Sequence, residues 1–378
     1  MKALIVGGGI GGLCAAIALR RGGHEVHVFE QAHEIRPAGA GITLWANALS
    51  ALQSLGVYDA LRAVGTTAAE GAIRTASGQT LSEDSSDALK AKLGLQELLL
   101  IFHRADLHRV LQAQIDPASL HTSATCCGFT AADDKVTAHF ADGAYASGDF
   151  LIGADGIHSV IRAQLHGHES PIYAGYTAWR AVIQYDHNAL RPGETWGRGA
   201  RFGQVPLTGG RVYWFATHNE PEGARAPASE KARLQQLFAG WHEPIPALIA
   251  AADEEQILRH DIYDRQPLTQ WGRGRVTLLG DAAHPMTPNL GQGACQAIED
   301  AVVLGQCLAR QPDVAEALRA YESRRIARTT ALVKQSRAIG RLGQLENPLL
   351  VHVRNAVMKH MPARVQVNQL ARVLAFTP

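Results

Sequence analysis

The sequence predicts an α/β fold in which two lobes are interleaved along the chain. The first 30 residues indicate a βαβ unit, because 3–6 reads as a buried strand, Gly11–Arg21 as a helix and Glu25–Glu30 as a second strand. A sheet-rich region follows later in the chain, and a fresh buried strand at 276–279 then leads into a glycine-rich loop and another helix. Elements of one nucleotide-binding fold therefore flank an inserted sheet.

The inserted sheet is predicted from composition. Three segments are rich in aromatic and β-branched residues, which favour strands: 172–185, 200–206 and 211–218. Thr208-Gly209-Gly210 between the last two is typical of a hairpin connection.

The region between the βαβ start and the inserted sheet is predicted to contain a helix and short strands. A polar stretch from Ser77 to Ser86 breaks the α/β rhythm, and Arg104–Ile115 has helical spacing. Short strands are expected at 136–140 and 150–152. After a helix from about Gly291 to Ala309 the chain is predicted to be helical almost to its end.

These elements predict three structural units. The nucleotide-binding unit is discontinuous and comprises 1–71, 101–171 and 269–335. The sheet unit comprises 72–100 and 172–268, and a C-terminal helical segment comprises 336–378.

Charge and cysteine content narrow the class of protein. Of the 378 residues, 36 are Lys or Arg and 35 are Asp or Glu, so no global field draws the chain to nucleic acid. Five cysteines form neither a disulfide framework nor a zinc pattern, and the first strand leaves no room for a signal peptide. No apolar run approaches a membrane span. We therefore expect a cytoplasmic protein, monomer or homodimer, that acts on a small molecule and holds no metal.

The first motif is a glycine fingerprint for a dinucleotide. Gly7, Gly9 and Gly12 form G-x-G-x-x-G between the first strand and helix, where glycines let the backbone approach a pyrophosphate. Glu30 ends the next strand, where a carboxylate accepts hydrogen bonds from a ribose. No second such fingerprint occurs, so a second dinucleotide would bind only transiently.

Two further motifs follow buried strands. Residues 153–162 read Gly-Ala-Asp-Gly-Ile-His-Ser-Val-Ile-Arg, and 280–293 read Gly-Asp-Ala-Ala-His-Pro-Met-Thr-Pro-Asn-Leu-Gly-Gln-Gly. Together with the glycine fingerprint and His-Arg-Ala-Asp-Leu at 103–107, they resemble the FAD-dependent aromatic hydroxylases of the para-hydroxybenzoate hydroxylase class. The resemblance covers about residues 1–340. Tyr-Ala-Gly-Tyr-Thr-Ala-Trp-Arg at 173–180 resembles the branch of salicylate and 3-hydroxybenzoate hydroxylases, zeaxanthin epoxidase and FAD-dependent urate hydroxylase.

The resemblance implies a Rossmann-like FAD-binding domain of that class and assigns site residues. Glu30 would bind ribose, Arg104 the FAD phosphates or ribose, and Asp281 the ribityl or pyrophosphate portion. Asp155 would serve FAD and NAD(P)H together by holding its loop and Arg162. The remaining cofactor-binding residues implied lie in the glycine fingerprint, after Glu30 and in the Gly-Asp loop: Gly7, Gly9, Gly11, Gly12, Gln31, Pro288, Gly291, Gln292 and Gly293.

The reaction implied by the resemblance is a monooxygenation. NAD(P)H binds transiently and reduces bound FAD, O2 adds to give a C4a-hydroperoxide, and one oxygen atom passes to a small aromatic or heteroaromatic substrate. A cation or hydroxyl near the substrate oxygen would activate the ring. The dipole of the helix beginning near Gly291 would stabilise anionic reduced flavin.

The sheet unit supplies the candidate catalytic and substrate residues. Arg201 and Tyr213 lie on consecutive predicted strands, so a cross-strand approach is expected, and they match the arginine and tyrosine that urate hydroxylase uses. Phe215 is a candidate apolar contact, and strand alternation excludes Trp214 from the same face. Asn289 stands where urate hydroxylase has an acid, and Ala178 where it has an asparagine, so urate is disfavoured.

Two alternatives stay open: oxidation of a larger isoprenoid or polycyclic substrate, and a flavin-binding redox protein without oxygenase activity. Among other residues, His284 is expected to bond to backbone, and Cys295 and Cys307 to pack in the core. Arg324, Arg325 and Arg328 are expected on a solvated helix face.

Overall fold

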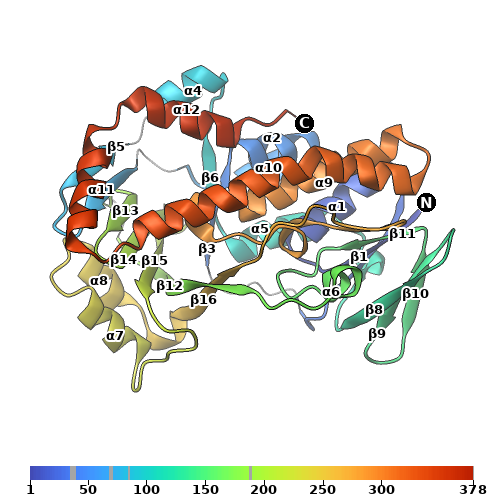
Figure 1. Cartoon of the computed structure of the whole chain (residues 1–378), viewed down its shortest axis with the longest axis horizontal. Helices are drawn as coiled ribbons and strands as arrows, with labels where there is room; N and C mark the ends of the chain where they lie inside the picture. The colour runs from blue at the N-terminus through green and yellow to red at the C-terminus, as the bar shows by residue number, and fades with distance from the viewer. Residues whose placement is uncertain (35–39, 68–70, 84–85, 187–189, 378) are drawn as a thin grey trace.

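A computed structural model of the chain describes residues 1–34, 40–67, 71–83, 86–186 and 190–377. Residues 84–85 of the predicted polar stretch lie outside these ranges. Figure 1 shows the long helix α10 running across the molecule, with the nucleotide-binding sheet toward one end and the strands of the sheet unit toward the other.

The nucleotide-binding unit is built on a five-stranded parallel sheet with the order β17-β11-β1-β2-β7. Its strands, in chain order, are β1 (Lys2–Val6), β2 (Glu25–Phe29), β7 (Leu120–His121), β11 (Phe150–Gly153) and β17 (Val276–Leu278). In β11 and in residues 3–6 of β1, the neighbouring inner strands, every residue is buried and is either apolar or glycine, as expected where helices cover both faces of a parallel sheet. The predicted βαβ start and the late return of the chain to this sheet are confirmed.

Helices pack around this sheet and bring its two sequence regions together. Helix α1 (Ile10–Arg21) packs against α9 (Gly293–Arg310), and α9 packs against α10 (Val314–Gly343). The other helices of this part are α2 (Ala46–Ser54), α3 (Tyr58–Arg62), α5 (Arg104–Gln112) and α6 (Val160–His166). A small antiparallel sheet lies beside them, formed by β8 (Cys126–Ala131), β9 (Val136–Phe140) and β10 (Tyr145–Gly148).

The second unit is a seven-stranded sheet with the order β16-β12-β15-β14-β13-β4-β5. Its strands are β4 (Ala72–Thr75), β5 (Thr80–Glu83), β12 (Ile172–Gln184), β13 (Gly193–Trp196), β14 (Ala200–Leu207), β15 (Arg211–Asn219) and β16 (Leu258–Asp264). Gly209 and Gly210 join β14 to β15 with φ of 73° and 70°, the left-handed values that a tight hairpin requires. The predicted hairpin is confirmed.

One face of this sheet carries its own core. Trp179, Trp214 and Phe202 are buried there against Phe238 and the helices α7 (Glu230–Leu237) and α8 (Ile245–Ala251). The opposite face is therefore left to meet the nucleotide-binding unit. A two-stranded sheet, β3 (Gly41–Trp45) with β6 (Leu99–His103), stands between the two units.

The C-terminal part is helical, as predicted. Helix α10 is continuous past 335 and 336, and it is followed by α11 (Pro348–His360) and α12 (Ala363–Leu374), which packs on α4 (Ser86–Leu93). Within the described residues, no helix combines the length and apolar character needed to cross a bilayer.

One expectation about α10 is wrong. Arg324 is exposed, but Arg325 is 1 % exposed and Arg328 is only partly exposed. Arg325 donates to Glu299 at 2.5 Å and to Asp300 at 2.7 Å, and Arg328 donates to Glu299 at 2.8 Å. Two of the three arginines therefore pair with buried carboxylates of α9 instead of facing solvent.

Candidate functional site: a cavity between the two sheets

The glycine fingerprint forms a turn that tolerates no side chain at two of its positions. Gly7 has φ of 110°, and a Cβ there would lie 2.2 Å from the carbonyl oxygen of Ala154. A Cβ on Gly12 would lie 2.0 Å from the carbonyl oxygen of Gly7. These glycines permit the close approach of β1, α1 and β11. Gly11 likewise packs tightly against Leu279 and Ala297.

Gly9 differs, because nothing lies within 4 Å of a Cβ built on it. Gly9 is the N-cap of α1, so its open side faces the free N–H groups and the positive dipole end of that helix. Glu30 lies at the end of β2 and accepts hydrogen bonds from the backbone N–H groups of Gly8 (2.7 Å) and Ala32 (2.9 Å). Gln31 follows it and is exposed. An anion-binding turn and a carboxylate thus meet at one edge of the sheet.

Asp155 holds the first turn of α6. Its carboxylate accepts hydrogen bonds from the Ser159 hydroxyl at 2.5 Å and the Val160 N–H at 2.8 Å. Burial raises the pKa of Asp155, while these hydrogen bonds act in the opposite direction. Asp155 therefore fixes the helix from which Arg162 projects.

Arg162 joins the two later motifs. It is 3 % exposed, and its guanidinium donates to the carbonyl oxygens of Ala282 (3.2 Å) and Ala283 (3.1 Å) in the Gly-Asp loop. Burial lowers the pKa of Arg162 to about 10, and Arg265 adds to the effect. The segments 153–162 and 280–293, far apart in sequence, are in direct contact.

Asp281 and Arg104 lie on the wall of a large cavity. Both side chains are exposed where they line this cavity, and desolvation by the surrounding protein raises the pKa of Asp281 and lowers that of Arg104. Each side chain partly offsets the shift of the other. A cation and an anion here can bind a ligand that has both phosphate and hydroxyl groups.

The Gly-Asp loop ends in a left-handed turn before α9. Pro288 begins a short 3-10 turn, Gly291 has φ of 61°, and α9 begins at Gly293. Gln292 is buried, and its side chain accepts a hydrogen bond from Asn47 at 2.9 Å. The Gln292 side chain is turned toward α2, so Gln292 can bind a ligand only through its backbone.

His284 also departs from expectation. Its Nε2 lies 2.6 Å from the Asp300 carboxylate, so its observed partner is a side chain and not the backbone. Asp300 also accepts from the Gly280 N–H at 3.0 Å. Burial acts to raise the pKa of Asp300, but His284 and Arg325 hold it below its usual range. Cys295 and Cys307 are buried, as expected.

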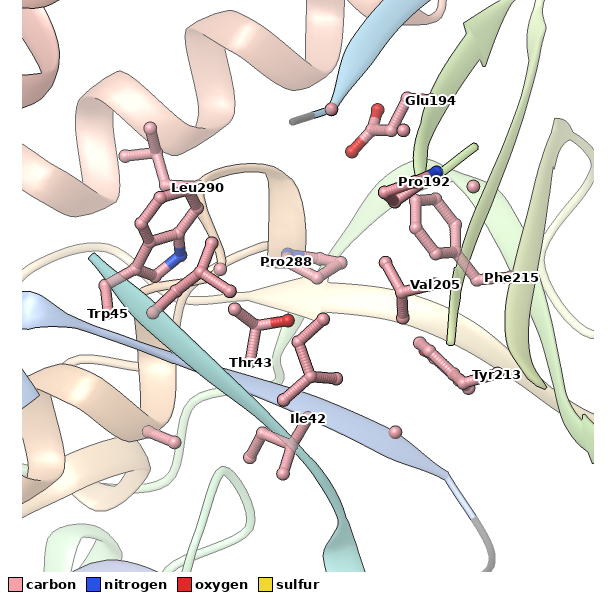
Figure 2. Close-up of a pocket in the computed structure, with 18 of the residues that line it drawn as sticks. Ile42, Thr43, Trp45, Pro192, Glu194, Val205, Tyr213, Phe215, Pro288 and Leu290 are labelled. Carbon is pink, nitrogen blue, oxygen red and sulfur yellow. The ribbon is translucent and has the colours of Figure 1, made fainter. Parts of the chain in front are cut away.

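The cavity has a volume of about 1140 Å³ and lies between the two units (Figure 2). Figure 2 shows apolar side chains from both sides around it, including Ile42 of β3, Phe215 of β15 and Leu290 of the Gly-Asp loop. Each of the four candidate substrate residues lines it: Arg201, Tyr213, Phe215 and Asn289.

The strand register places Arg201 and Tyr213 differently from expectation. On the antiparallel pair β14 and β15, Arg201 is opposite Thr217, and Tyr213 is opposite Val205. Tyr213, Phe215 and Thr217 share one face, so Tyr213 and Arg201 line the same wall about 13 Å apart along the strands. They are not cross-strand partners. Phe215 lies between them, over Gly203, and Trp214 faces the opposite core, as alternation predicts.

Asn289 links Arg201 to Tyr176 and to helix α10 through hydrogen bonds. Its side-chain oxygen accepts from Arg201 at 2.5 Å, and its amide nitrogen donates to the Ser336 carbonyl at 3.1 Å. Tyr176 lies within hydrogen-bonding distance of the same amide. An aspartate could not donate to the Ser336 carbonyl, so this α10 contact favours the asparagine.

Helix α10 supports the wall from behind, because it contacts the lining residues Asn289 and Arg201, and sequence patterns did not predict this. A Cβ on Gly340 would lie 2.4 Å from the Asn289 amide nitrogen, and one on Gly343 would lie 2.9 Å from Arg201. Gln344 accepts a hydrogen bond from Arg201 at 3.1 Å. Two glycines three residues apart in a helix were the available signal, because each costs about 1 kcal/mol relative to alanine.

Arg180 is a second residue that the sequence analysis missed as a site candidate. It lines the cavity and lies beside Tyr213, whose ring packs over Gly41 of β3. Burial raises the pKa of Tyr213, and Arg180 partly offsets this. Position 180 ends the 173–180 motif, and strand alternation from Ala178 could have placed it on the cavity face.

Comparison with known proteins identifies the family. The family described as FAD binding domain matches residues 1–336. The chain belongs to this family. It is 42 % identical over 380 residues to the aurachin C monooxygenase/isomerase of Stigmatella aurantiaca, covering 100 % of this chain and 99 % of that protein. It is 39 % identical over 346 residues to an FAD-dependent urate hydroxylase of Klebsiella pneumoniae, covering 89 % of each.

A solved structure agrees with this assignment. The crystal structure of Klebsiella pneumoniae HpxO complexed with FAD and uric acid is 34 % identical, covers 99 % of this chain and 96 % of that one, and has a TM-score of 0.93. The expected class, fold and FAD cofactor are thereby confirmed. The protein is an FAD-dependent oxidoreductase of the monooxygenase and hydroxylase family.

The residues of this member fit FAD. The open side of Gly9 at the N-terminus of α1 suits a pyrophosphate, and Glu30 at the adjacent strand end suits a ribose. Arg104 and Asp281 continue the path into the cavity. Helix α9 follows the turn at Gly291, and its N-terminus lies at this cavity.

Proposed function

We propose that this protein is a single-component NAD(P)H- and O2-dependent monooxygenase that hydroxylates a small aromatic or heteroaromatic compound. The observation that carries the proposal is one cavity that contains both the FAD-type residues Arg104 and Asp281 and the polar residues Arg201 and Tyr213 of the other sheet. Bound FAD, reduced by NAD(P)H, supplies the oxygen-transfer chemistry with O2. The resemblance to aromatic hydroxylases supports the same assignment.

The cavity walls are suited to a flat apolar ring. Ile42, Val205 and Phe215 provide apolar contacts, and Pro288 closes the space toward α9. Apolar walls with a few polar groups are typical of small-molecule sites. Their role would be to exclude water, which otherwise releases the activated oxygen as hydrogen peroxide.

The polar residues would orient and activate the ring. Burial keeps Tyr213 protonated at neutral pH, because its pKa is raised, so its hydroxyl can donate a hydrogen bond to a substrate oxygen. Arg180 beside it and Arg201 along the wall are cations that favour an anionic, electron-rich ring. Asn289 would hold the Arg201 guanidinium in place.

The α9 terminus and the Asp155 motif would serve the cofactors. The free N–H groups at Gly291–Gly293 and the helix dipole would stabilise negative charge on reduced FAD. Asp155 would act through α6 and Arg162, which grips the Gly-Asp loop, to support both FAD and transient NAD(P)H binding.

A larger isoprenoid or polycyclic substrate is a second candidate. The cavity of about 1140 Å³ is shared with FAD, because Arg104 and Asp281 line it, so its volume does not measure the substrate. The 42 % identical relative is named for aurachin C, whereas the urate hydroxylases are named for urate. Urate itself is disfavoured for this chain by Asn289 and Ala178. A flavin-binding protein without oxygenase activity would retain the cavity but transfer no oxygen.

We also propose a cytoplasmic monomer or homodimer. All five cysteines are free thiols, which supports a reducing compartment.

The test is isotope incorporation. Purified FAD-loaded protein is incubated with NADH or NADPH and ¹⁸O2 in the presence of phenolic acids, hydroxyquinolines, aurachin C or urate, and products are analysed by mass spectrometry. Gain of one ¹⁸O atom per molecule of one compound supports the proposal. FAD reduction that yields only hydrogen peroxide with every compound would favour the non-oxygenase alternative.

A further inference from the structure

The exposed large apolar side chains of the described residues gather at one place. Nine are exposed, and six of them lie between 342 and 365: Leu342, Leu349, Leu350, Val353, Val357 and Val365. Leu349 is 70 % exposed and Val357 is 55 % exposed. We call these six side chains the C-terminal apolar patch.

Helix α11 presents most of the patch as one stripe. Leu349, Val353 and Val357 repeat every four residues, and Leu350 lies beside them, so all four share one face of the helix. The neighbouring face is anchored, because Arg354, four residues after Leu350, is 3 % exposed and donates to the carbonyl oxygens of Gly343 (3.3 Å) and Gly197 (3.1 Å). The apolar face is therefore directed outward by a fixed contact.

The formal charges on the two helices that follow Asn347 have one sign, whereas Glu346 just before them is an exposed carboxylate. From Pro348 to Pro378 the sequence contains four Lys or Arg and no Asp or Glu. Of these four, Lys359, Arg364 and Arg372 are exposed. Arg341 is exposed beside Leu342, and the carboxylate of Glu346 accepts a hydrogen bond from Asn219 at 2.7 Å. An apolar stripe flanked by cations is typical of a helix that lies on an anionic membrane surface.

We propose that the C-terminal apolar patch docks this enzyme on anionic phospholipid bilayers, with α11 lying in the headgroup region. The apolar side chains would enter the acyl boundary, and Lys359 and Arg364 would contact lipid phosphates. No segment crosses the bilayer in this arrangement, consistent with the absence of a spanning helix from the described ranges.

A second copy of this chain fits the patch less well. A two-fold dimer places the same surface on both partners, so the cations of one patch would face those of the other. The α11 stripe, nine residues from Leu349 to Val357, is also only about 12 Å long. A stable dimer requires a larger buried area than such a stripe supplies, about 1,200 to 2,000 Å² in total.

The position of the patch relates to the cavity. Helix α11 packs on β5, and α12 packs on α4, whose Ser86, Asp87 and Lys90 line the cavity. The Ser82 hydroxyl donates to Gln366 at 2.9 Å, which ties β5 to α12. Figure 1 shows α11, α12, α4 and β5 at the same end of the molecule. A docked enzyme would thus hold this side of the cavity near the membrane.

The test is vesicle co-sedimentation of the FAD-loaded protein, which requires no turnover and is therefore independent of the proposed reaction. Vesicles of phosphatidylcholine with phosphatidylglycerol at equal amounts are compared with pure phosphatidylcholine, at low and high salt. We expect binding to the anionic vesicles and at least about tenfold weaker binding of the triple variant Leu349→Ser, Val353→Ser, Val357→Ser. A variant with Lys359→Ser and Arg364→Ser should lose the preference for anionic vesicles.

The control variant carries Tyr145→Ser and Ile172→Ser, which remove exposed apolar side chains outside the patch. It should bind vesicles as the unmodified protein does. FAD content and melting temperature verify that each variant is folded. Absence of binding to anionic vesicles, or equal binding by the triple variant, would overturn the proposal. So would light scattering that shows a dimer which the triple variant dissociates, because a second copy would then cover the patch.

Discussion

Tyr213 is a half-buried phenol at the cavity wall, and the guanidinium groups of Arg180 and Arg104 both act on it. The raised pKa keeps its hydroxyl protonated, and Arg180 is near enough to affect that pKa. Its ring also packs over Gly41, so removing only the oxygen atom preserves the shape of the wall. The hydroxyl can therefore be tested separately from the packing.

We predict that Tyr213→Phe retains bound FAD but forms about tenfold to hundredfold less product per unit time, because one hydrogen-bond donor to the substrate is lost. Product formed and NAD(P)H consumed are measured together, and the ratio should fall. Tyr145→Phe, at a side chain 74 % exposed, is the control. An unchanged ratio and rate in Tyr213→Phe would remove this hydroxyl from the mechanism.

His108 makes stability depend on pH. It is 4 % exposed, neither ring nitrogen has a hydrogen-bond partner, and burial, with help from Arg104, lowers its pKa to about 4. In the unfolded chain histidine has a pKa of about 6.5, so the unfolded state binds the proton first as pH falls. The contribution of neutral His108 is therefore full above about pH 6.5 and is lost progressively as pH falls toward 4.

We predict that His108 alone reduces the free energy of unfolding by about 2 kcal/mol between pH 7 and pH 5. Urea unfolding of the unmodified protein and of His108→Phe at both pH values measures this contribution. The variant should lose less stability on acidification. Equal losses in the two proteins would show that His108 is not held neutral.

At the scale of elements, the β1–α1 turn separates glycines needed for folding from one needed for the cofactor. A Cβ at Gly12 would collide with Gly7, whereas a Cβ at Gly9 would meet open space. Gly9 has φ of −70° and ψ of 178°, which any residue can adopt. Substitution at Gly9 should therefore affect only what binds there.

We predict that Gly9→Val leaves the melting temperature of the FAD-free protein unchanged but weakens FAD binding by at least about tenfold, because the pyrophosphate needs that space. Gly12→Val is the matched comparison, and it should lower the melting temperature without FAD as well. Fluorescence titration with FAD gives the affinity. Normal FAD affinity in Gly9→Val would place the pyrophosphate elsewhere.

The α9–α10 pair is joined by buried charges. Arg325 bonds to Glu299 and Asp300, and Asp300 in turn holds His284 and the Gly280 N–H of the Gly-Asp loop. These groups are almost completely buried, so removing the Arg325 cation leaves Glu299 with Arg328, and Asp300 with His284, as remaining side-chain partners for two buried carboxylates.

We predict that Arg325→Met lowers the free energy of unfolding by about 3 to 5 kcal/mol. Arg324→Met, one residue away on the exposed face, should change it by less than about 0.5 kcal/mol. Chemical denaturation of the FAD-loaded proteins measures both. Similar losses in the two variants would contradict the assignment of Arg325 to a buried network.

At the scale of the whole molecule, local patterns predicted the sheet and the motifs, but not the contacts between distant elements. The βαβ start, the hairpin at Gly209-Gly210 and the helix after Gly291 follow from spacing and turn chemistry within a few residues. The burial of Arg325 does not, because its carboxylate partners come from another helix. The register of Arg201 also depended on where β14 and β15 pair, which strand composition does not determine.

The site shows the same division. The motif residues Arg104, Asp155 and Asp281 were identified by resemblance, and the structure places Arg104 and Asp281 at the cavity and Asp155 at the adjoining helix start. The α10 residues Gly340, Gly343 and Gln344 were missed, since the two helical glycines do not indicate which residues they contact and the Arg201–Gln344 hydrogen bond spans 143 positions. Sequence patterns also predicted no role for the C-terminal helices, whereas the exposed apolar side chains of α11 support the proposed membrane docking.

The central claim is the proposed function, in which NAD(P)H reduces FAD for hydroxylation of a ligand held in the cavity that Tyr213 and Arg201 line. The most direct measurement is the anaerobic rate of FAD reduction by NADH and by NADPH, alone and with phenolic acids, hydroxypyridines, hydroxyquinolines, aurachin C and urate, followed by stopped-flow absorbance. The account predicts that one ligand class accelerates reduction at least about tenfold and that urate does not. Failure of both nicotinamides to reduce the FAD with every ligand would contradict it.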